Sequence, residues 1–405
     1  MRRSEDRILT SHVGSLHPPR DLQDLLLAAD KGELADPGQL DERLRTAVEE
    51  VVRHQRKLGV DIVDDGEFSK SSWMGYAAER LGGIEIVSLA DTVGEGERLD
   101  DSELFPSKDQ RDFDDFYNQA RSHMFILEPG AGEELEARAF ARDVKVVGPI
   151  RYEGHNVIAR DIANLKAAAE AAGVEEAFMP VVAPGSVQPW ITNEHYTSTE
   201  QMFADIAAAL RHEYKAIVDA GLIVQIDDAF IANEWDHQLA LDPGYQLETF
   251  REWANLAVEA VNSALEGIPE DRVRYHLCWG SWNGPHSTDI PLRDIVDLIL
   301  KVNAQTYAIE AANARHEWEF RVWEDVKLPE GKILMPGVIE HSTNVVEHPE
   351  TVAERILRFA ELLGRENVIA GTDCGFRNRS HPQVAWAKLR ALSEGAQLAS
   401  KRLWK

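Results

Sequence analysis

The sequence of 405 residues predicts a (β/α)8 TIM barrel, and three observations lead to this fold class. Short runs of β-branched residues alternate with amphipathic helical patterns, as expected for βα units with a parallel sheet. The strand candidates are almost continuously apolar, which is typical of a sheet covered on both faces. Acids, histidines and cysteines gather where these runs end, and in βα barrels the carboxyl ends of the strands carry the active site.

Each element follows from the same alternation. The candidate strands are residues 8–13, 60–63, 144–147, 177–182, 222–226, 273–278, 306–310, 333–338 and 367–371. The amphipathic helices are expected at residues 41–58, 199–220, 247–265, 292–302 and 349–363. These nine strands are one more than the barrel needs, and the surplus strand is assigned to 144–147. We therefore expect a single barrel domain over residues 1–405, with an insertion or hairpin at approximately 89–145 that begins as an acidic lid or long loop.

Charge and composition exclude several classes of partner. The net charge of −27 disfavours nucleic acid and anionic membranes. No apolar run reaches the ~18 residues of a membrane span, and no apolar segment of a signal peptide follows the charged N-terminus. Two cysteines far apart argue against a disulfide framework and for a reducing compartment. We expect a cytoplasmic enzyme that acts on small molecules, and the sequence leaves its oligomeric state open.

The residues at the strand ends have the composition of a zinc site. His276 and Cys278 lie two residues apart on one predicted strand, so their side chains face the same way. Glu310 follows Cys278 by 32 residues and precedes Cys374 by 64, which is about one and two βα units. The four side chains therefore belong to equivalent strand ends on one rim. Zinc binds Cys, His and carboxylate in tetrahedral geometry, so the sequence predicts a Zn²⁺ site at these residues.

Plainer interpretations compete with this one. Free cysteines are usually small buried hydrophobic residues. A structural zinc would normally use Cys-X-X-Cys knuckles on loops, a form that the sequence lacks. His316, with acids beside it, could belong to a second metal site or to the charged start of a helix. Glu67 and Asp227 could cap the helices that follow their strands. The joint spacing of the four strand-end residues favours a catalytic metal.

The expected ligand charge selects the chemistry. Two thiolates and a carboxylate give the metal site a formal charge of about −1 before substrate binds, which makes the metal a poor Lewis acid. Such a metal keeps a substrate thiol deprotonated and nucleophilic, so alkylation of a thiol is favoured over hydrolysis. Transfer of a methyl group from nitrogen also needs a general acid, for which His341, Asp373 and His12 are candidates.

A set of motifs in fixed order resembles the cobalamin-independent methionine synthases, specifically their catalytic C-terminal half. The motifs are Thr10-Ser11-His12-Val13-Gly14-Ser15-Leu16, Gly59-Val60-Asp61-Ile62-Val63-Asp64-Asp65-Gly66-Glu67, Gln225-Ile226-Asp227-Asp228, His276-Leu277-Cys278, Ile309-Glu310, Pro336-Gly337-Val338 and Thr372-Asp373-Cys374-Gly375. The resemblance covers nearly the whole chain. It implies a barrel of the type shared by methionine synthases and uroporphyrinogen decarboxylases.

The resemblance also implies roles for individual residues. The zinc ligands are His276, Cys278, Glu310 and Cys374. Glu67 and Asp227 hold the amino group of a thiol such as homocysteine, with Asp228 beside them. Gly14 and Ser15 lie near its carboxylate, and Trp190 stacks on a folate ring. The family's proton-shuttling histidine matches His341 with an offset of about one position. The implied reaction is zinc-dependent transfer of a methyl group to homocysteine or a related thiol from methyltetrahydrofolate or another donor, a step of methionine biosynthesis.

The chain departs from the family in ways that keep other functions open. It lacks the N-terminal barrel of the full-length synthases, and Asn233 replaces an acid that contacts the pterin. Short single-barrel relatives include transferases that open epoxides with coenzyme M, and Lys70, Arg377 and Arg379 would suit its sulfonate. Outside alkyl transfer, the alternatives are a uroporphyrinogen-decarboxylase-like enzyme, a zinc hydrolase and a non-enzymatic barrel that binds folate or thiol.

Overall fold

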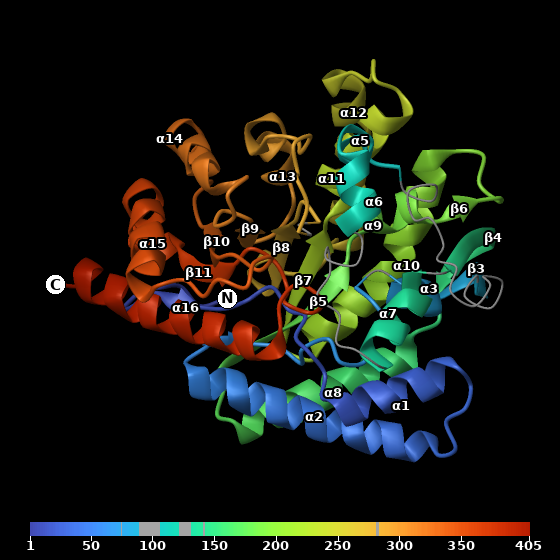
Figure 1. The fold of residues 1–405 in the computed structure, drawn as a ribbon, viewed down its shortest axis with the longest axis horizontal. Coiled ribbons are helices and arrows are strands. Elements are labelled where there is room, and N and C mark those ends of the chain that lie inside the picture. Colours follow the sequence, from blue (N-terminus) through green and yellow to red (C-terminus); the bar gives the residue numbers. More distant parts are fainter. Residues whose placement is uncertain (74, 89–105, 121–130, 141, 281–282) are drawn as a thin grey trace.

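The computed structural model describes residues 1–73, 75–88, 106–120, 131–140, 142–280 and 283–405. Eight parallel strands form the central sheet, in the order β1-β11-β10-β9-β8-β7-β5-β2. A parallel bridge between Ser11 and Ile62 joins β1 to β2 and closes the sheet. The predicted (β/α)8 barrel is therefore confirmed (Figure 1). Its strands are β1 (Leu9–Thr10), β2 (Ile62–Val63), β5 (Glu176–Val182), β7 (Ile223–Asp228), β8 (Val273–Leu277), β9 (Thr306–Ile309), β10 (Ile333–Ile339) and β11 (Ile369–Thr372).

Long helices surround the barrel (Figure 1). They are α2 (Pro37–Leu58), α8 (His155–Ala171), α10 (Thr199–Asp219), α12 (Leu247–Ala264), α15 (Pro349–Leu363) and α16 (Pro382–Leu403). The shorter helices are α1 (Arg20–Asp30), α3 (Gly75–Glu79), α5 (Lys108–Asp112), α6 (Asp114–Ala120), α7 (Ala131–Phe140), α9 (Pro184–Val187), α11 (Phe230–Leu241), α13 (Val296–Ile299) and α14 (Val322–Asp325). Single 3-10 turns are η1 (Gln188–Trp190), η2 (Glu270–Arg272), η3 (Leu292–Asp294), η4 (Glu317–Arg321) and η5 (Arg365–Asn367).

Local signals explain where the long helices begin and end. Ser198 caps α10 by accepting a hydrogen bond from the backbone N–H of Gln201. Gly59 ends α2 in the left-handed conformation, with φ 90°. The helix expected at residues 292–302 is instead divided into η3 and α13. Ile295, with φ −132°, interrupts the helical conformation between them.

A second, smaller sheet lies beside the barrel. In it β3 (Leu81–Ser88) pairs antiparallel with β4 (Arg142–Tyr152), and β6 (Thr192–Asn193) pairs parallel with β4. The strand expected at 144–147 belongs to β4, outside the barrel. The sequence analysis missed β3, because its two glycines, Gly82 and Gly83, and a charged residue obscure the apolar pattern. Residues 89–105 and 121–130 of the expected insertion lie outside the described residues.

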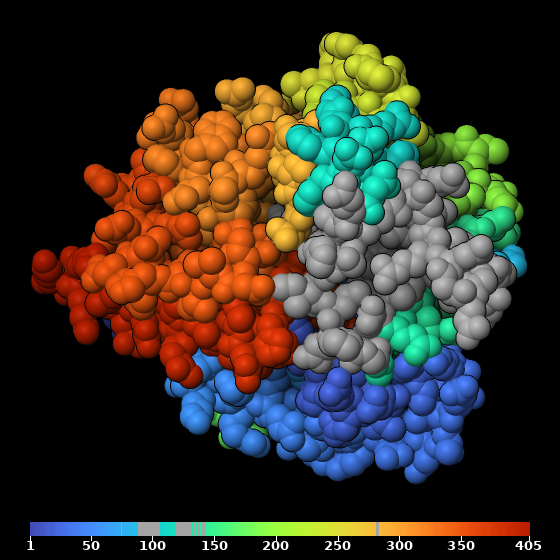
Figure 2. Space-filling view, viewed as in Figure 1, coloured from blue at the N-terminus to red at the C-terminus, as the bar shows by residue number. Residues whose placement is uncertain are grey.

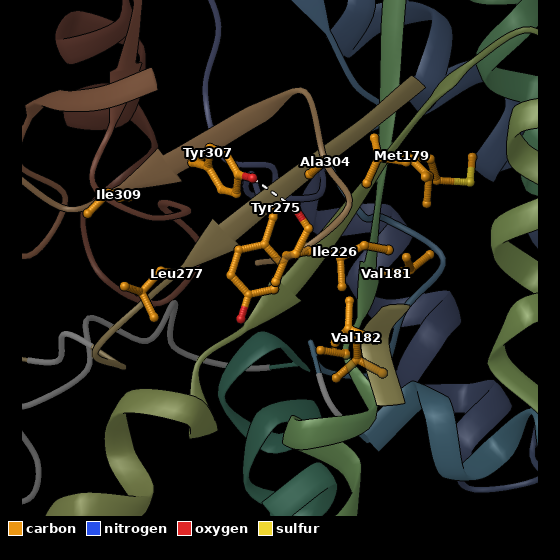
Figure 3. Close-up of a cluster of buried hydrophobic side chains, with 14 of the residues drawn as sticks. Met179, Val181, Val182, Ile226, Tyr275, Leu277, Ala304, Tyr307 and Ile309 are labelled. Carbon is orange, nitrogen blue, oxygen red and sulfur yellow. Dashed lines mark hydrogen bonds between the residues drawn. The ribbon is translucent and has the colours of Figure 1, made fainter. Parts of the chain in front are cut away.

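Apolar side chains pack in two layers, one on each face of the barrel sheet. The layer inside the barrel includes Phe178, Ile223 and Met335. Outside the strands, Tyr275, Leu277 and their neighbours pack towards the helices (Figure 3). Successive side chains of a strand alternate between its faces, so this outer layer turns the even-numbered side chains of β8 into the barrel.

The segment with α5 and α6 is attached to the loop that follows β8. Asp109 of α5 accepts hydrogen bonds from the backbone N–H groups of His286 and Ser287, at 3.1 and 2.9 Å. Figure 2 shows this cyan segment against the yellow-orange atoms of that region. Among the residues that the structure describes, no helix has both the length and the apolar composition to cross a bilayer.

Candidate functional site

The candidate site lies where β7, β8, β9 and β11 end on one rim of the barrel. The sheet register aligns Asp227 of β7 with His276 of β8, and His276 with Ala308 of β9. Cys278 and Glu310 follow the ends of β8 and β9, and Cys374 follows the end of β11. The parallel register thus brings residues that are far apart in the sequence to one height on the rim.

Three of the four expected ligands form one compact group. One ligand atom each from His276, Cys278 and Cys374 lies within 4.8 Å of the other two. The sulfur atoms of the two cysteines are 3.4 Å apart. Nδ1 of His276 lies 3.3 Å from the backbone oxygen of Ala308, so this nitrogen donates its proton there. Nε2 is then the ring nitrogen left for a metal, and it is buried with no nitrogen or oxygen partner among the described residues.

This donor set fits a tetrahedral metal ion. Two sulfur atoms that each lie about 2.3 Å from a tetrahedral zinc are about 3.8 Å apart. The observed separation of 3.4 Å therefore needs only a small adjustment. A buried imidazole nitrogen without a partner costs free energy unless something binds it. Nε2 of His276 and the two sulfurs together have the composition of a site for zinc.

The two thiols share one proton. The Cys278 thiol donates to the Cys374 sulfur and thereby holds the pKa of Cys374 well below that of an ordinary thiol. The same contact, together with burial, raises the pKa of Cys278 well above its usual value. Burial alone would lower the pKa of His276, but the neighbouring Cys374 thiolate raises it. The site therefore holds a thiolate, which is the form of cysteine that binds metal.

Glu310, the fourth expected ligand, lies beside this group but outside it. Its Oε1 accepts a hydrogen bond from the backbone N–H of Trp279 at 2.9 Å, and its Oε2 accepts one from Nδ2 of Asn313 at 2.8 Å. Trp279 directly follows Cys278, so the carboxylate lies next to the metal group, by which we mean His276, Cys278 and Cys374. A carboxylate in this position can orient towards a metal bound by the cysteines.

Asp373 is surrounded by hydrogen-bond donors. Its Oδ1 accepts from the backbone N–H groups of Ala311 and Ala312, and its Oδ2 accepts from the backbone N–H and Nδ2 of Asn313, all at 2.8–3.1 Å. Burial raises the pKa of Asp373 to about 7, and the backbone donors act against this shift. Four N–H donors stabilise a carboxylate in its charged form, so this environment suits a brace between β9 and β11 better than a proton donor.

The two histidines expected as general acids lie in different surroundings. His341 follows β10, is buried, and its charge contributes to the lowered pKa of Cys374. His12 is bonded through Nε2 to Gln55 at 2.8 Å, and its Nδ1 accepts from the backbone N–H of Gly14 at 3.2 Å. Burial lowers the pKa of His12 to about 4. His12 is therefore neutral and supports the Gly14 loop, whereas His341 lies near the thiols.

Two carboxylates near the metal group each keep one oxygen open. Oδ1 of Asp227 accepts a hydrogen bond from Nε2 of Gln225 at 2.7 Å, and Oε2 of Glu67 accepts one from Nζ of Lys70 at 2.8 Å. Among the described residues, none donates a hydrogen bond to Oδ2 of Asp227 or to Oε1 of Glu67. Burial raises the pKa of Asp227 to about 7, and the charges of Glu67 and Cys374 add to this shift. Asp227 therefore lies between the metal group and Glu67.

Asp228 points away from these carboxylates and is fully buried. Its Oδ1 accepts from Oγ of Ser186, and its Oδ2 accepts from the Tyr275 hydroxyl, both at 2.8 Å. Successive side chains of a strand face opposite sides, so Asp228 faces outward because Asp227 faces the barrel interior. The contacts fit a brace between the ends of β5, β7 and β8, and they leave Asp228 outside the candidate pocket.

Ser15 lies on the loop that meets the segment after β11. Its backbone oxygen accepts from the N–H groups of Phe376 and Arg377, at 2.8 and 3.3 Å. A Cβ atom on Gly375 would lie 2.1 Å from Oγ and 3.0 Å from the backbone N of Ser15, so a larger residue would force the loop to shift. Trp190 lies in η1, half-buried against the outer core, and no described contact joins it to the metal group.

The interpretation of His316 as part of a charged helix start agrees better with the structure than a second metal site. Its Nδ1 lies 2.8 Å from Glu319 and its Nε2 lies 3.1 Å from Asp289, while its ring packs on Trp279 at 4.2 Å. Although burial lowers the pKa of His316, these two acids raise it to about 10. A protonated imidazole donates from both nitrogens and cannot bind a metal.

The sequence analysis missed the amides that orient the acids. Asn313 holds both Glu310 and Asp373, and Gln225 holds Asp227. Neither amide has a distinctive neighbour in the sequence. Gln225 offers one weak signal, since a polar side chain within a buried strand needs a partner, and this strand alternation turns it to the same side as Asp227.

Comparison with known proteins relates this geometry to a family. The family model "Cobalamin-independent synthase, Catalytic domain" matches residues 8–99 and 150–398. The methionine synthase of Thermococcus kodakarensis is 24% identical over 97% of this chain and 94% of its own length. The methionine synthase of Saccharolobus solfataricus is 23% identical over 97% and 95%.

Solved structures have the same fold. A B12-independent methionine synthase from Shewanella sp. W3-18-1, in complex with selenomethionine, aligns over 98% of this chain and 99% of its own with a TM-score of 0.69 at 20% identity. A putative vitamin-B12-independent methionine synthase from Listeria monocytogenes aligns over 96% and 98% with a TM-score of 0.64, also at 20% identity. The chain therefore belongs to the family of cobalamin-independent methionine synthases, which are methyltransferases.

Proposed function

We propose that this protein transfers a methyl group to homocysteine at a zinc ion held by His276, Cys278, Cys374 and Glu310. The observation that carries the proposal is the group of two cysteine sulfurs and one imidazole nitrogen of His276, all within 4.8 Å of one another at the rim of the barrel. Glu310 is the fourth ligand in this proposal, because its carboxylate lies next to Cys278 and is bonded to the backbone N–H of Trp279.

A bound zinc ion would supply a coordinated substrate thiolate, which is nucleophilic at neutral pH. Side chains of this protein would position the ligands and transfer the proton. Asp373 fixes the loop that carries Glu310 and Asn313. His341 is the proposed general acid that protonates the departing amine of the donor, because it lies near Cys374 and an imidazole is a common general acid.

Two carboxylates accommodate the amino group of the acceptor in this proposal. The open oxygens of Glu67 and Asp227 suit an ammonium, and the backbone at Gly14 and Ser15 suits the carboxylate of the same amino acid. Homocysteine offers both groups and a thiol. The proposed donor is methyltetrahydrofolate, whose ring would stack on Trp190. The names of the related proteins from Thermococcus kodakarensis and Saccharolobus solfataricus support this choice of reaction.

The alternative enzymes have less support. A hydrolytic zinc site would use three histidines, or two histidines and a glutamate, instead of two cysteines. A decarboxylase of the uroporphyrinogen type would need none of the cysteines. Addition of a thiol to an epoxide would use the same metal, so it remains an alternative at the level of the second substrate.

The test combines metal analysis with absorption at the zinc edge. The purified protein should contain about one zinc per chain, and Cys278→Ser and Cys374→Ser should lose it. On addition of homocysteine, the number of sulfur neighbours should rise by one at about 2.3 Å from the metal.

A matched control is His54→Gln beside His276→Gln, because His54 lies on the outer helix α2 and stacks on Trp386. The His54 variant should keep its zinc, while the His276 variant should lose it. Absence of zinc from the unmutated protein, or an unchanged sulfur shell with homocysteine, would refute the proposed function.

A further inference from the structure

We propose that Lys70 is a positioning residue that holds Glu67 in place for the ammonium of an amino-acid thiol. This inference rests on the proposed function and adds a residue that positions one of its proposed substrate contacts. It also implies that Lys70 does not bind an anionic group of the substrate. Lys70 should therefore add no affinity for a thiol that bears a sulfonate.

The ammonium of Lys70 is enclosed on three sides. Nζ lies 2.8 Å from Oε2 of Glu67 and 2.7 Å from the backbone oxygen of Pro180. It also lies 4.5 Å from the centre of the Tyr76 ring, within range of a cation–π contact. An ammonium has three N–H donors and no acceptor, so two donors are hydrogen-bonded and the Tyr76 ring lies beside the group. The side chain is 6% exposed, so the ammonium is screened from a substrate anion.

Glu67 needs such support because its backbone is strained. Its φ is 61°, in the left-handed region that residues other than glycine rarely adopt. Oδ1 of Asp65 accepts a hydrogen bond from the Glu67 N–H at 2.9 Å, and the Lys70 N–H bonds back to the Glu67 oxygen at 3.2 Å. Lys70 thus completes a tight turn in which both the backbone and the carboxylate of Glu67 are held.

The second carboxylate oxygen of Glu67, Oε1, faces the loop at Gly14 and Ser15. A Cβ atom on Gly14 would lie 2.7 Å from Oε1 of Glu67, so this oxygen lies directly against the backbone at Gly14. Oδ2 of Asp227 also lacks a donor among the described residues. Two carboxylate oxygens are therefore left for a substrate cation, while the Lys70 ammonium is already paired with Oε2 of Glu67. A substrate ammonium, with up to three donors, matches the two open oxygens.

The charges around Lys70 agree with this role. Burial lowers the pKa of Lys70, but the charge and hydrogen bond of Glu67, with Asp65 and Asp227, raise it above its ordinary value. Lys70 is therefore always charged near neutral pH. Without it, Glu67 would carry a buried charge beside two further acids, and such a charge is relieved only by a proton or by movement of the side chain. Either change removes the acceptor for the substrate ammonium.

The test measures binding of two thiols that differ only in the amino group. Homocysteine and its deamino analogue, 4-mercaptobutanoate, are titrated into the zinc-loaded protein by calorimetry. In Lys70→Met, the Kd for homocysteine should rise roughly ten- to hundredfold, as for loss of one charged hydrogen bond. The Kd for 4-mercaptobutanoate should stay within about twofold of the unmutated value. This change is much smaller than the roughly tenfold effect of losing one charged hydrogen bond. Lys70→Arg should recover part of the loss for homocysteine because it restores the charge.

Lys332→Met is the matched control. Nζ of Lys332 also bridges a carboxylate and a backbone oxygen, from Glu270 at 2.6 Å and Ala304 at 2.8 Å, but it precedes β10 at the opposite end of the barrel. This variant should leave both Kd values unchanged. Lys70→Gln keeps a polar side chain in the same space and serves as the second variant if Lys70→Met fails to fold.

The outcomes separate the two proposals. Unchanged or tighter binding of homocysteine in both Lys70→Met and Lys70→Gln would overturn the positioning role, since a competing lysine would have the opposite effect. Equal weakening of both thiols would overturn it as well, because the loss would then be unrelated to the ammonium. If the unmutated, zinc-loaded protein binds neither thiol, the proposed function fails, and the role of Lys70 fails with it.

Discussion

At the scale of single residues, buried carboxylates in this protein differ in the partners that surround them. Asp373 and Asp228 have every oxygen occupied by donors of the chain, whereas Asp227 and Glu67 each keep one oxygen open. Only an open oxygen can bind a substrate group without first breaking an internal hydrogen bond, and breaking such a bond in a buried site is costly. Under the proposed function, open oxygens are the candidates for contact with the substrate, and filled ones belong to the framework around them.

Substitution of Asp228 tests this distinction. Asp228→Ala leaves the buried hydroxyls of Ser186 and Tyr275 without their acceptor and should lower the free energy of unfolding by about 2–4 kcal/mol. Asp228→Asn still offers partners to both hydroxyls, so its loss should be under about 1 kcal/mol. Urea unfolding measures both values. Homocysteine binding should be unchanged in Asp228→Asn, and a large rise in its Kd would return Asp228 to the substrate pocket.

At the scale of elements, the loop after β8 depends on contacts with α5. Asp109 accepts four hydrogen bonds, from the Tyr117 hydroxyl at 2.8 Å, the backbone N–H of His286 at 3.1 Å, and the N–H and hydroxyl of Ser287 at 2.9 and 2.7 Å. Asp236 of α11 accepts from the Asp109 N–H at 3.1 Å. One carboxylate therefore attaches a short helix to the loop that follows the candidate ligand Cys278.

Loss of this carboxylate should loosen the loop without dismantling the barrel. In Asp109→Ala, the amides of His286 and Ser287 should exchange with deuterium at least about tenfold faster, as expected for loss of about 1.4 kcal/mol of local stability. Hydrogen exchange followed by mass spectrometry measures this change. Asp112→Ala is the control, because Asp112 lies on the same helix and pairs with Lys108 on the surface. Equal exchange in the two variants would show that Asp109 does not hold the loop.

At the scale of the whole molecule, the candidate metal would connect strands that are not neighbours in the sheet. His276 and Cys278 belong to the end of β8, and Cys374 follows β11, with β9 and β10 between them in the sheet. A ligand that binds only the folded state stabilises it by an amount set by its concentration and Kd. The metal proposed here would therefore stabilise the barrel across four strands.

Removal of the metal should accordingly lower the melting temperature. At a free zinc concentration about 100 times its Kd, binding adds about 2.7 kcal/mol to the stability of the folded protein. Calorimetry with and without a chelator should show a lower Tm for the chelated protein and its recovery with added zinc. Cys278→Ser should melt at the same temperature in both conditions. A chelator-sensitive Tm in that variant would mean that the stabilising metal binds elsewhere.

The sequence contained enough to predict the barrel strands, because their near-continuous apolar runs are local properties. All eight barrel strands coincide with predicted runs, although β1 and β2 are only two residues long. The strand β3 was missed, because its glycines and charges hide a pairing that only the partner strand β4 supplies. The predicted helix at 292–302 was wrong in its continuity, because one residue, Ile295, leaves the helical conformation.

For the candidate site, spacing along the chain was informative because βα units have similar lengths. The spacing between Cys278 and Cys374 placed both on one rim, and the structure brings their sulfurs to 3.4 Å. Spacing contains no information on which oxygen of an acid is already bonded. The bracing contacts of Asp373 and Asp228, and the enclosure of Lys70, became visible only in the folded chain.

By itself, the sequence determined the fold class, the strands that line the barrel and the residue types at its rim. These depend on apolar periodicity and on the order of residues along one chain. The tertiary structure decided which acid oxygens lack a donor, which histidine lies near the thiols and which groups Lys70 contacts. Those properties arise when distant segments meet, because a hydrogen bond depends on the distance and direction of two groups and not on their separation in sequence.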